Sequence, residues 1–318
     1  MRLDGRSRPA HVLGARGPLL LGLLGIALAF ASDAVAQPNP ARRLAFGVMT
    51  DREAEPDRVL RVFSDLVAVL RERLQPAGIQ VPDIVIARDV EDLARRIAGG
   101  EVDFVIETVF PTLLLQARAQ PLEPALVVIR RGRREYRSVF FARKDGPIRS
   151  LADLEGRVLV LQAERSTSAF ALPRAELARN GIDLVAAGDA ARPARAVRYV
   201  LADAEVNQAV WVLHGRGDAG AFNEVDWEAL PAGIRDQLQI FHETRPILRA
   251  LLSFRAGLHV SVRREVEKLL VALPQDPEGI AALNRATGIT AFEPLTARDR
   301  EGLREWRAVL KPLASSRP

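Results

Sequence analysis

Apolar and polar positions alternate between strand and helix patterns from residue 44 onwards. Residues 44–49 form an apolar run that predicts a strand, and residues 59–74 carry apolar side chains at the i, i+3, i+4, i+7 spacing of a helix. The same order recurs in residues 83–118. Further strands are predicted at 126–129, 158–161, 184–187, 219–222, 237–243 and 250–254. Short βα repeats of this kind predict a mostly parallel sheet with helices on both faces.

Two segments interrupt the βα alternation. Tyr136–Arg143 and Gln237–Phe254 are extended and partly apolar, and we expect them to cross between two domains. The predicted fold class is therefore α/β, with two lobes, two doubly wound sheets and two crossover strands. Helix starts are predicted at Asp89, Ser261, Asp276 and Thr296, with Pro312 ending the last helix.

The apolar run Val158–Leu161 is followed by a hydroxyl-rich turn. Ser166 stands before good helix formers and can cap a helix, which leaves the backbone N–H groups of Thr167 and Ser168 unpaired in its first turn. Free N–H groups, the positive end of the helix dipole and adjacent hydroxyls suit a tetrahedral anion. An isolated Ser-Thr-Ser is more often an ordinary cap. Pro173 must kink this helix, or the helix starts there and leaves the serines in a loop.

Ligands of open α/β sheets bind outside the carboxyl ends of the strands. This rule selects Thr50, Glu107 with Thr108, and Ser166 to Ser168. A carboxylate at position 107 would repel a phosphate-type dianion. Glu107 either pairs with the cationic part of a zwitterionic ligand, such as an aminoalkyl phosphonate, or pairs with a nearby arginine, and the second alternative is favoured. Tyr136 is either a packing residue of the hinge or a ligand contact.

The first 36 residues predict an export signal. A basic start, an apolar stretch at residues 19–31 and Ala34-Val35-Ala36 precede a cleavage site before Gln37. The apolar stretch is shorter than the roughly 20 residues of a membrane-spanning helix. The chain has no cysteine, which excludes a lipid-modified cysteine anchor and disulfides. We therefore expect a periplasmic protein that does not span the membrane after cleavage near Ala36.

Other chemistry has little support. The histidines at 214, 242 and 259 lack metal-ligand spacing, and no G-x-S-x-G, Walker or G-x-G-x-x-G motif is present. The basic cluster at residues 130–134 lacks interleaved aromatic residues, which disfavours nucleic-acid binding and indicates a solvated loop. We expect no catalysis, no metal and no cofactor.

Residues 136–177 closely resemble the phosphate, phosphite and phosphonate-binding periplasmic proteins of ABC transporters. That family shows a Tyr-[Lys/Arg]-Ser crossover strand, a Ser-Leu-x-Asp-Leu-x-Gly turn and a Ser-Thr-Ser-x-x-x-x-Pro anion loop in this order, and all three are present here. The resemblance extends more loosely from Phe46 to about Leu273. It implies a type II periplasmic binding protein, with lobe 1 at residues 37–140 plus 233–318 and lobe 2 at 141–232.

The resemblance also implies a ligand site in the cleft between the lobes. It adds Asn223 and Asn207 as ligand-facing residues, although the family's histidine is missing from the segment Glu205-Val206-Asn207. We expect capture of a small oxyanion for an ABC permease, or alternatively ligand sensing for a membrane signalling receptor. The predicted binding residues are Ser166, Thr167, Ser168, Tyr136, Thr50, Glu107, Thr108, Asn207 and Asn223.

Overall fold

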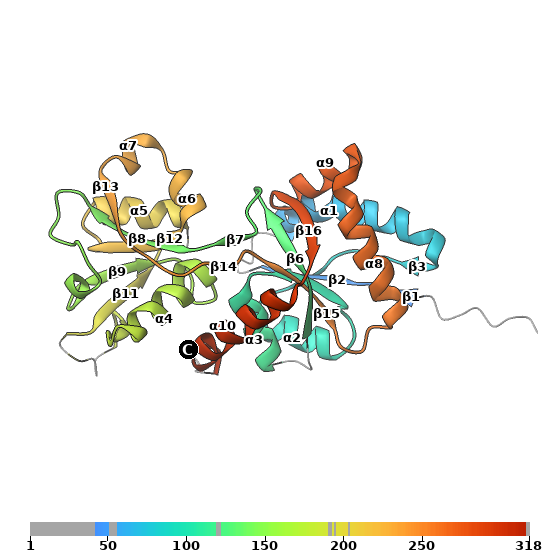
Figure 1. The fold of residues 1–318 in the computed structure, drawn as a ribbon, viewed down its shortest axis with the longest axis horizontal. Helices are drawn as coiled ribbons and strands as arrows, with labels where there is room; N and C mark the ends of the chain where they lie inside the picture. The colour runs from blue at the N-terminus through green and yellow to red at the C-terminus, as the bar shows by residue number, and fades with distance from the viewer. Residues whose placement is uncertain are drawn as a thin grey trace, which may run out of the picture. The chain divides into compact units, whose positions relative to one another are not determined.

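The computed structural model describes most of the chain beyond the predicted signal (Figure 1). The described residues are 42–50, 56–118, 122–189, 193, 195–202 and 204–315. The predicted signal at residues 1–36 lies outside them. Across these ranges, no helix has the length and apolar character needed to cross a membrane.

The first sheet has six strands in the order β16-β6-β15-β5-β2-β4. They are β2 (Phe46–Met49), β4 (Val85–Ala87), β5 (Phe104–Glu107), β6 (Leu122–Arg130), β15 (Leu251–Arg255) and β16 (Ile289–Pro294). β2 is parallel to β4 and β5, whereas β15 is antiparallel to β5 and β6, and β16 is antiparallel to β6. The expectation of a mostly parallel sheet is wrong here, because β15 enters between β5 and β6 from the second sheet and runs against both.

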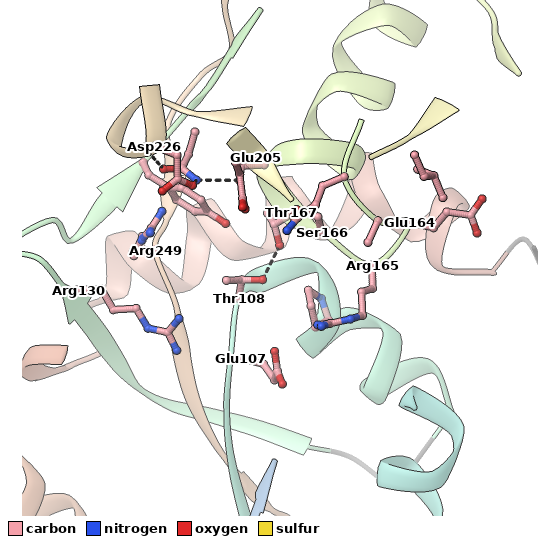
Figure 2. Close-up of a pocket in the computed structure, with 17 residues that line it drawn as sticks. Glu107, Thr108, Arg130, Glu164, Arg165, Ser166, Thr167, Glu205, Asp226 and Arg249 are labelled. Carbon is pink, nitrogen blue, oxygen red and sulfur yellow. Dashed lines mark hydrogen bonds between the residues drawn. The ribbon is translucent and has the colours of Figure 1, made fainter. Parts of the chain in front are cut away.

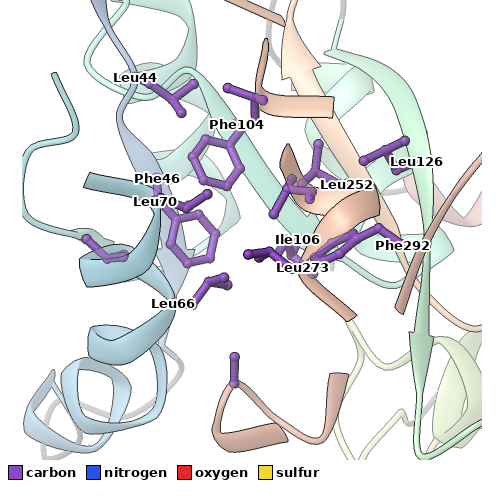
Figure 3. Close-up of a cluster of buried hydrophobic side chains, with 14 of the residues drawn as sticks. Leu44, Phe46, Leu66, Leu70, Phe104, Ile106, Leu126, Leu252, Leu273 and Phe292 are labelled. Carbon is purple, nitrogen blue, oxygen red and sulfur yellow. The ribbon is translucent and has the colours of Figure 1, made fainter. Parts of the chain in front are cut away.

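Helices cover both faces of this sheet. One face packs against α1 (Pro56–Leu74), α8 (Val260–Ala272) and α9 (Pro277–Arg285). The other packs against α2 (Val90–Ala98), α3 (Val109–Arg118) and α10 (Ala297–Ser315). Figure 3 shows the first of these cores, in which the rings of Phe46 and Phe104 stack at 4.7 Å beside Leu66 and Leu70 of α1. The apolar stripe predicted at residues 59–74 is therefore the buried face of α1.

The second sheet also has six strands, in the order β10-β11-β9-β12-β8-β13. They are β8 (Ser138–Arg143), β9 (Val158–Leu161), β10 (Leu184–Ala186), β11 (Val197–Leu201), β12 (Ala219–Asn223) and β13 (Leu238–Glu243). β9 to β12 are parallel, and β8 is antiparallel to its neighbours β12 and β13. The helix α4 (Leu172–Arg179) packs on one face and α5 (Glu205–Leu213) on the other.

A short antiparallel pair connects the two sheets. β7 (Glu135–Tyr136) pairs with β14 (Ile247–Leu248), and both run between the two sheets in Figure 1. These strands lie in the two segments predicted to cross, so the predicted fold class, two α/β sheets joined by two crossing strands, is confirmed. The lobe boundaries at residues 140 and 232 remain predictions.

Two helix ends differ from the sequence prediction. The cap of α8 is His259 and not Ser261, because the Ser261 backbone N–H donates to His259 Nδ1 at 3.2 Å. α10 runs through Pro312 to Ser315 and does not end there, since a proline removes only one backbone donor. Asp89 and Asp276 cap α2 and α9 as predicted. The remaining short elements are β1 (Arg42–Arg43), β3 (Ile79–Gln80), α6 (Glu224–Glu228) and α7 (Ala232–Arg235), with 3-10 turns at Gln75–Ala77, Ala152–Leu154 and Leu273–Gln275.

Candidate functional site

A cavity of about 780 Å³ is lined by residues of both sheets and of the connecting strands (Figure 2). The predicted residues that line it are Glu107, Thr108, Tyr136, Ser166, Thr167, Ser168 and Asn223. Thr50 and Asn207 are not among the lining residues. The Thr50 backbone N–H donates to Ala87 O at 2.9 Å, and the Asn207 amide donates to Ala202 O at 3.1 Å. The cavity therefore brings together the loops after β5, β9 and β12.

The serine loop begins a helix as the sequence predicts. Ser166 is the N-cap, and its hydroxyl accepts a hydrogen bond from the Ala169 backbone N–H at 3.1 Å. A π-helical turn over Thr167–Ala171 follows and continues into α4. The Thr167 and Ser168 backbone N–H groups are the first two of this helix, and no acceptor for them is found in the described part of the chain. These donors face the position where an anion is favoured.

Pro173 does not break this helix. Proline at 173 has no N–H to offer the Ala169 carbonyl, four residues earlier. The Gln162 backbone N–H donates to that carbonyl at 3.2 Å instead. The wider π turn, in which the Ala171 N–H donates to Ser166 O at 2.9 Å, ends just before the proline. The serines thus stand in the first turn of a continuous helix, which resolves the alternative that the sequence left open.

The hydroxyl oxygens of this loop accept hydrogen bonds from N–H groups of the protein. The Thr167 hydroxyl lies 2.8 Å from Thr108 Oγ1 and accepts from the Phe110 N–H at 3.0 Å. Ser168 Oγ accepts from Asn223 Nδ2 at 3.5 Å, and Ser166 Oγ accepts as described. A hydroxyl has only one hydrogen to donate, and in the Thr108–Thr167 pair either oxygen can be the donor. The backbone N–H groups of Thr167 and Ser168 are therefore the donors of this loop that are arranged for an oxyanion.

Arg130 and Arg249 place positive charge in the same cavity (Figure 2). Arg130 is the last residue of β6, and its buried Nε has no hydrogen-bond partner among the described residues. Burial lowers the pKa of Arg130, Glu107 raises it, and Arg249 lowers it again. The Arg249 guanidinium lies 4.5 Å from the centre of the Tyr136 ring. Glu107 acts on Arg130 through its charge, but the buried Arg130 Nε still has no hydrogen-bond partner among the described residues, so it can donate to a ligand.

Tyr136 is both a packing residue and part of the cavity wall. It is only 3% exposed, and it packs with Ile247 and Leu248 of β14. Burial raises the pKa of Tyr136, whereas Arg249 and the neighbouring hydroxyls of Thr167 and Ser168 act in the opposite direction. The phenol therefore stays protonated at neutral pH and offers a hydrogen bond and no charge.

Four carboxylates also line the cavity, and their surroundings differ. Glu164 accepts from the Tyr199 hydroxyl at 2.6 Å, and Asp226 accepts from the Asn223 side chain. Glu107 lies in the electrostatic field of Arg130, which favours its pairing with an arginine. Glu205 begins α5, and no described side chain forms a hydrogen bond or ion pair with it. Burial raises the pKa of Glu205, Asp226 raises it further, and its own backbone N–H, Arg249 and Arg131 lower it.

Sequence reasoning missed Arg130, Arg249 and Glu205 as cavity residues. The expectation of a solvated basic loop at residues 130–134 is wrong for Arg130, which lines the cavity, and for Arg134, which pairs with Asp299 at 2.6 Å. One signal was present in the sequence. Arg249 is a single charged residue between the apolar residues 247–248 and 250–252. An arginine in such an apolar segment is rarely buried unless it is paired, which indicates a partner or a ligand for its charge.

Comparison with known proteins gives consistent matches. The family model described as "ABC transporter, phosphonate, periplasmic substrate-binding protein" matches residues 46–299. XAC2383 from Xanthomonas citri, solved bound to chloride ion, is 31% identical, with 86% of this chain and 98% of that chain covered and a TM-score of 0.79. The same protein bound to ATP gives 30% identity, the same coverage and a TM-score of 0.78.

A more distant structure has the same fold. PhnD1 from Prochlorococcus marinus in complex with methylphosphonate is 16% identical, covers 87% of this chain and 100% of its own, and has a TM-score of 0.65. The search of curated proteins returned no match.

Proposed function

The chain belongs to the family of periplasmic substrate-binding proteins of phosphonate ABC transporters, and from that premise we propose that its cavity captures a small phosphorus oxyanion for import. Members of this family bind small ligands and work with ABC permeases. The ligand class we assign is phosphonate, phosphate or phosphite. The residues that we propose as its contacts are Ser166, Thr167, Ser168, Tyr136, Thr108, Asn223, Arg130 and Arg249.

The observation that carries this proposal is the pair Arg130 and Arg249. The two guanidinium groups in one cavity repel each other, and the negative charge of Glu107 acts on Arg130 in the opposite direction. A bound dianion relieves this repulsion and forms charge-assisted hydrogen bonds with both. The N–H and O–H donors of Thr167 and Ser168 complete the anion's coordination from the other side of the cavity.

A second cavity of about 770 Å³ is less suited to an anion. It lies beside β14 and α10, and its walls include Glu135, Glu293, Glu301 and Glu305. Its Arg134 is already paired with Asp299 and with Glu293. The relatives support the first cavity's chemistry, because the ligands of the two named above, chloride, ATP and methylphosphonate, are all anions.

The family is exported to the periplasm, and we propose that this chain is exported by its first 36 residues and cleaved before Gln37. N-terminal sequencing of the periplasmic fraction tests this directly. Recovery of an uncleaved chain in the membrane fraction would contradict it. Nothing in the proposed function requires a catalytic step.

Titration calorimetry with methylphosphonate and inorganic phosphate tests the ligand class. Arg249→Gln removes a charged donor, and we expect binding to weaken by about 1.5–3 kcal/mol, the range for a hydrogen bond to a charged group. Arg133→Gln is the matched control, because Arg133 belongs to the neighbouring basic turn and pairs with Glu228 at 3.1 Å. The proposal fails if no phosphorus oxyanion binds, or if both variants weaken binding equally.

A further inference from the structure

Glu205 is one of four carboxyl groups in the wall of a cavity that also presents N–H and guanidinium donors to an anion. It lies at the start of α5, and Figure 2 shows it among the side chains that line the cavity. The other lining carboxylates are engaged elsewhere: Glu164 with Tyr199 and Asp226 with Asn223, while Glu107 lies in the field of Arg130. An ionised Glu205 would repel any ligand that offers only negatively charged oxygens.

A proton between Glu205 and the ligand removes this conflict. A phosphonate or phosphate retains an ionisable P–OH near neutral pH, and that group can donate to the Glu205 carboxylate. A sulfonate or sulfate is fully ionised and has no such hydrogen. We infer that Glu205 makes the cavity selective for oxyanions that carry an ionisable P–OH, and against sulfonates and sulfate of the same shape. This inference rests on the proposed function and adds a specificity-determining residue to it.

The surroundings of Glu205 fit a shared proton. Asp226 faces it from α6, which disfavours a second negative charge, whereas Arg249 and Arg131 face it from the connecting segments and keep the group from being permanently neutral. Tyr136, on β7, also lines the cavity and is itself a neutral donor. Because these charges act in opposite directions, the Glu205 carboxyl group can either be protonated or, as a carboxylate, accept a hydrogen bond from the P–OH of the ligand. The complex is therefore expected to contain one proton more than its separated, ionised components.

Methylphosphonate and methanesulfonate form a matched pair of probes. At about one pH unit below the second pKa of methylphosphonate, most of each ligand carries one negative charge, and the main remaining difference is the P–OH. We expect the parent protein to prefer methylphosphonate. Glu205→Gln replaces the acceptor with an amide that can donate to either ligand, so the preference should fall by about 10- to 150-fold, which corresponds to one hydrogen bond to a charged group.

Glu164→Gln is the control, because it also removes a carboxylate from the cavity wall, but one that is bonded to Tyr199. Glu164→Gln should change the affinities for methylphosphonate and methanesulfonate by the same factor, so the ratio of the two affinities should stay as in the parent. A change in the ratio for both variants, or for neither, would overturn the assignment to Glu205. Inorganic phosphate and sulfate provide a second pair with the same expected order.

Proton counting gives an independent readout. Above the second pKa of methylphosphonate, calorimetry in two buffers of different ionisation enthalpy should show uptake of about one proton per bound ligand for the parent and nearly none for Glu205→Gln. Equal uptake in both proteins contradicts the inference. Equal affinity of the parent for methylphosphonate and methanesulfonate also contradicts it but leaves the proposed oxyanion function standing, whereas a parent that binds neither pair overturns both.

Discussion

Replacing Thr167 with valine tests whether hydrogen bonds of the Thr167 hydroxyl connect the serine loop to the first sheet. The substitution keeps the shape of the side chain and removes its hydroxyl. In the parent this hydroxyl accepts from the Phe110 backbone N–H at 3.0 Å and lies 2.8 Å from Thr108 Oγ1. Phe110 is 2% exposed and Thr167 is also 2% exposed, so water cannot easily replace the lost partner. The loop and the start of α3 would lose their polar connection.

The size of the effect follows from these contacts. Leaving a buried backbone N–H without an acceptor costs about 1–3 kcal/mol, and we expect Thr167→Val to lower the free energy of unfolding by that amount. Thr108→Val is the matched control, because it removes only the hydroxyl pair and leaves the Phe110 N–H bonded to Thr167. Its expected cost is about 0.5–1.5 kcal/mol, the value of one ordinary hydrogen bond.

Urea unfolding followed by tryptophan fluorescence measures both values. The slope of the free energy with urea should be the same for parent and variants, which shows that the change lies in stability and not in the extent of unfolding. If Thr167→Val lowers the free energy of unfolding no more than Thr108→Val does, the hydrogen bond from the Phe110 N–H to the Thr167 hydroxyl does not contribute to stability. The proposed connection between the serine loop and α3 would then be wrong.

Two further predictions concern stability. The Arg134 guanidinium holds the pKa of Asp299 well below its ordinary value, so this carboxylate stabilises the fold above the unfolded pKa of about 3.9 and loses that contribution as the pH falls towards the folded value. Asp299→Asn should therefore cost about 1.5–3 kcal/mol in urea unfolding at pH 7 and progressively less below pH 3.9; a difference that does not depend on pH would contradict the ion pair. At Gly279, a Cβ would lie 2.1 Å from the Leu273 carbonyl oxygen, so Gly279→Ala should cost about 1–3 kcal/mol in thermal unfolding. Gly302→Ala in α10, where a Cβ meets nothing within 4 Å, should instead stabilise by up to about 1 kcal/mol, and equal effects at both sites would refute the steric argument.

Local sequence patterns predicted the parts of the site that depend on neighbouring residues. A strand at 158–161, a serine and a run of helix formers place the cap at Ser166, and the hydrogen bond from Ala169 follows from that local order. The cap at Asp276 is local in the same sense. The π turn before Pro173 was not predictable, because the bond that makes the proline tolerable comes from Gln162 in the preceding segment.

Contacts between distant segments could not be predicted from such patterns. The hydroxyl pair of Thr108 and Thr167 joins residues 59 positions apart in the sequence. Arg130 and Arg249 line the same cavity because β15 enters between β5 and β6 and brings the second crossing segment beside the first. Sequence spacing does not show where β15 is inserted, so the pattern at residues 130–134 predicts only a solvated basic loop. β11 and β16 were missed because each interrupts its apolar residues with polar ones.

A crystal structure of the protein grown with methylphosphonate would show where the ligand binds. We expect phosphonate density in the cavity of Figure 2, with its oxygens within hydrogen-bond distance of Ser168 and of the guanidinium groups of Arg130 and Arg249. A phosphonate bound elsewhere on the protein, or this cavity left without phosphonate in crystals of protein that binds methylphosphonate in solution, would contradict it.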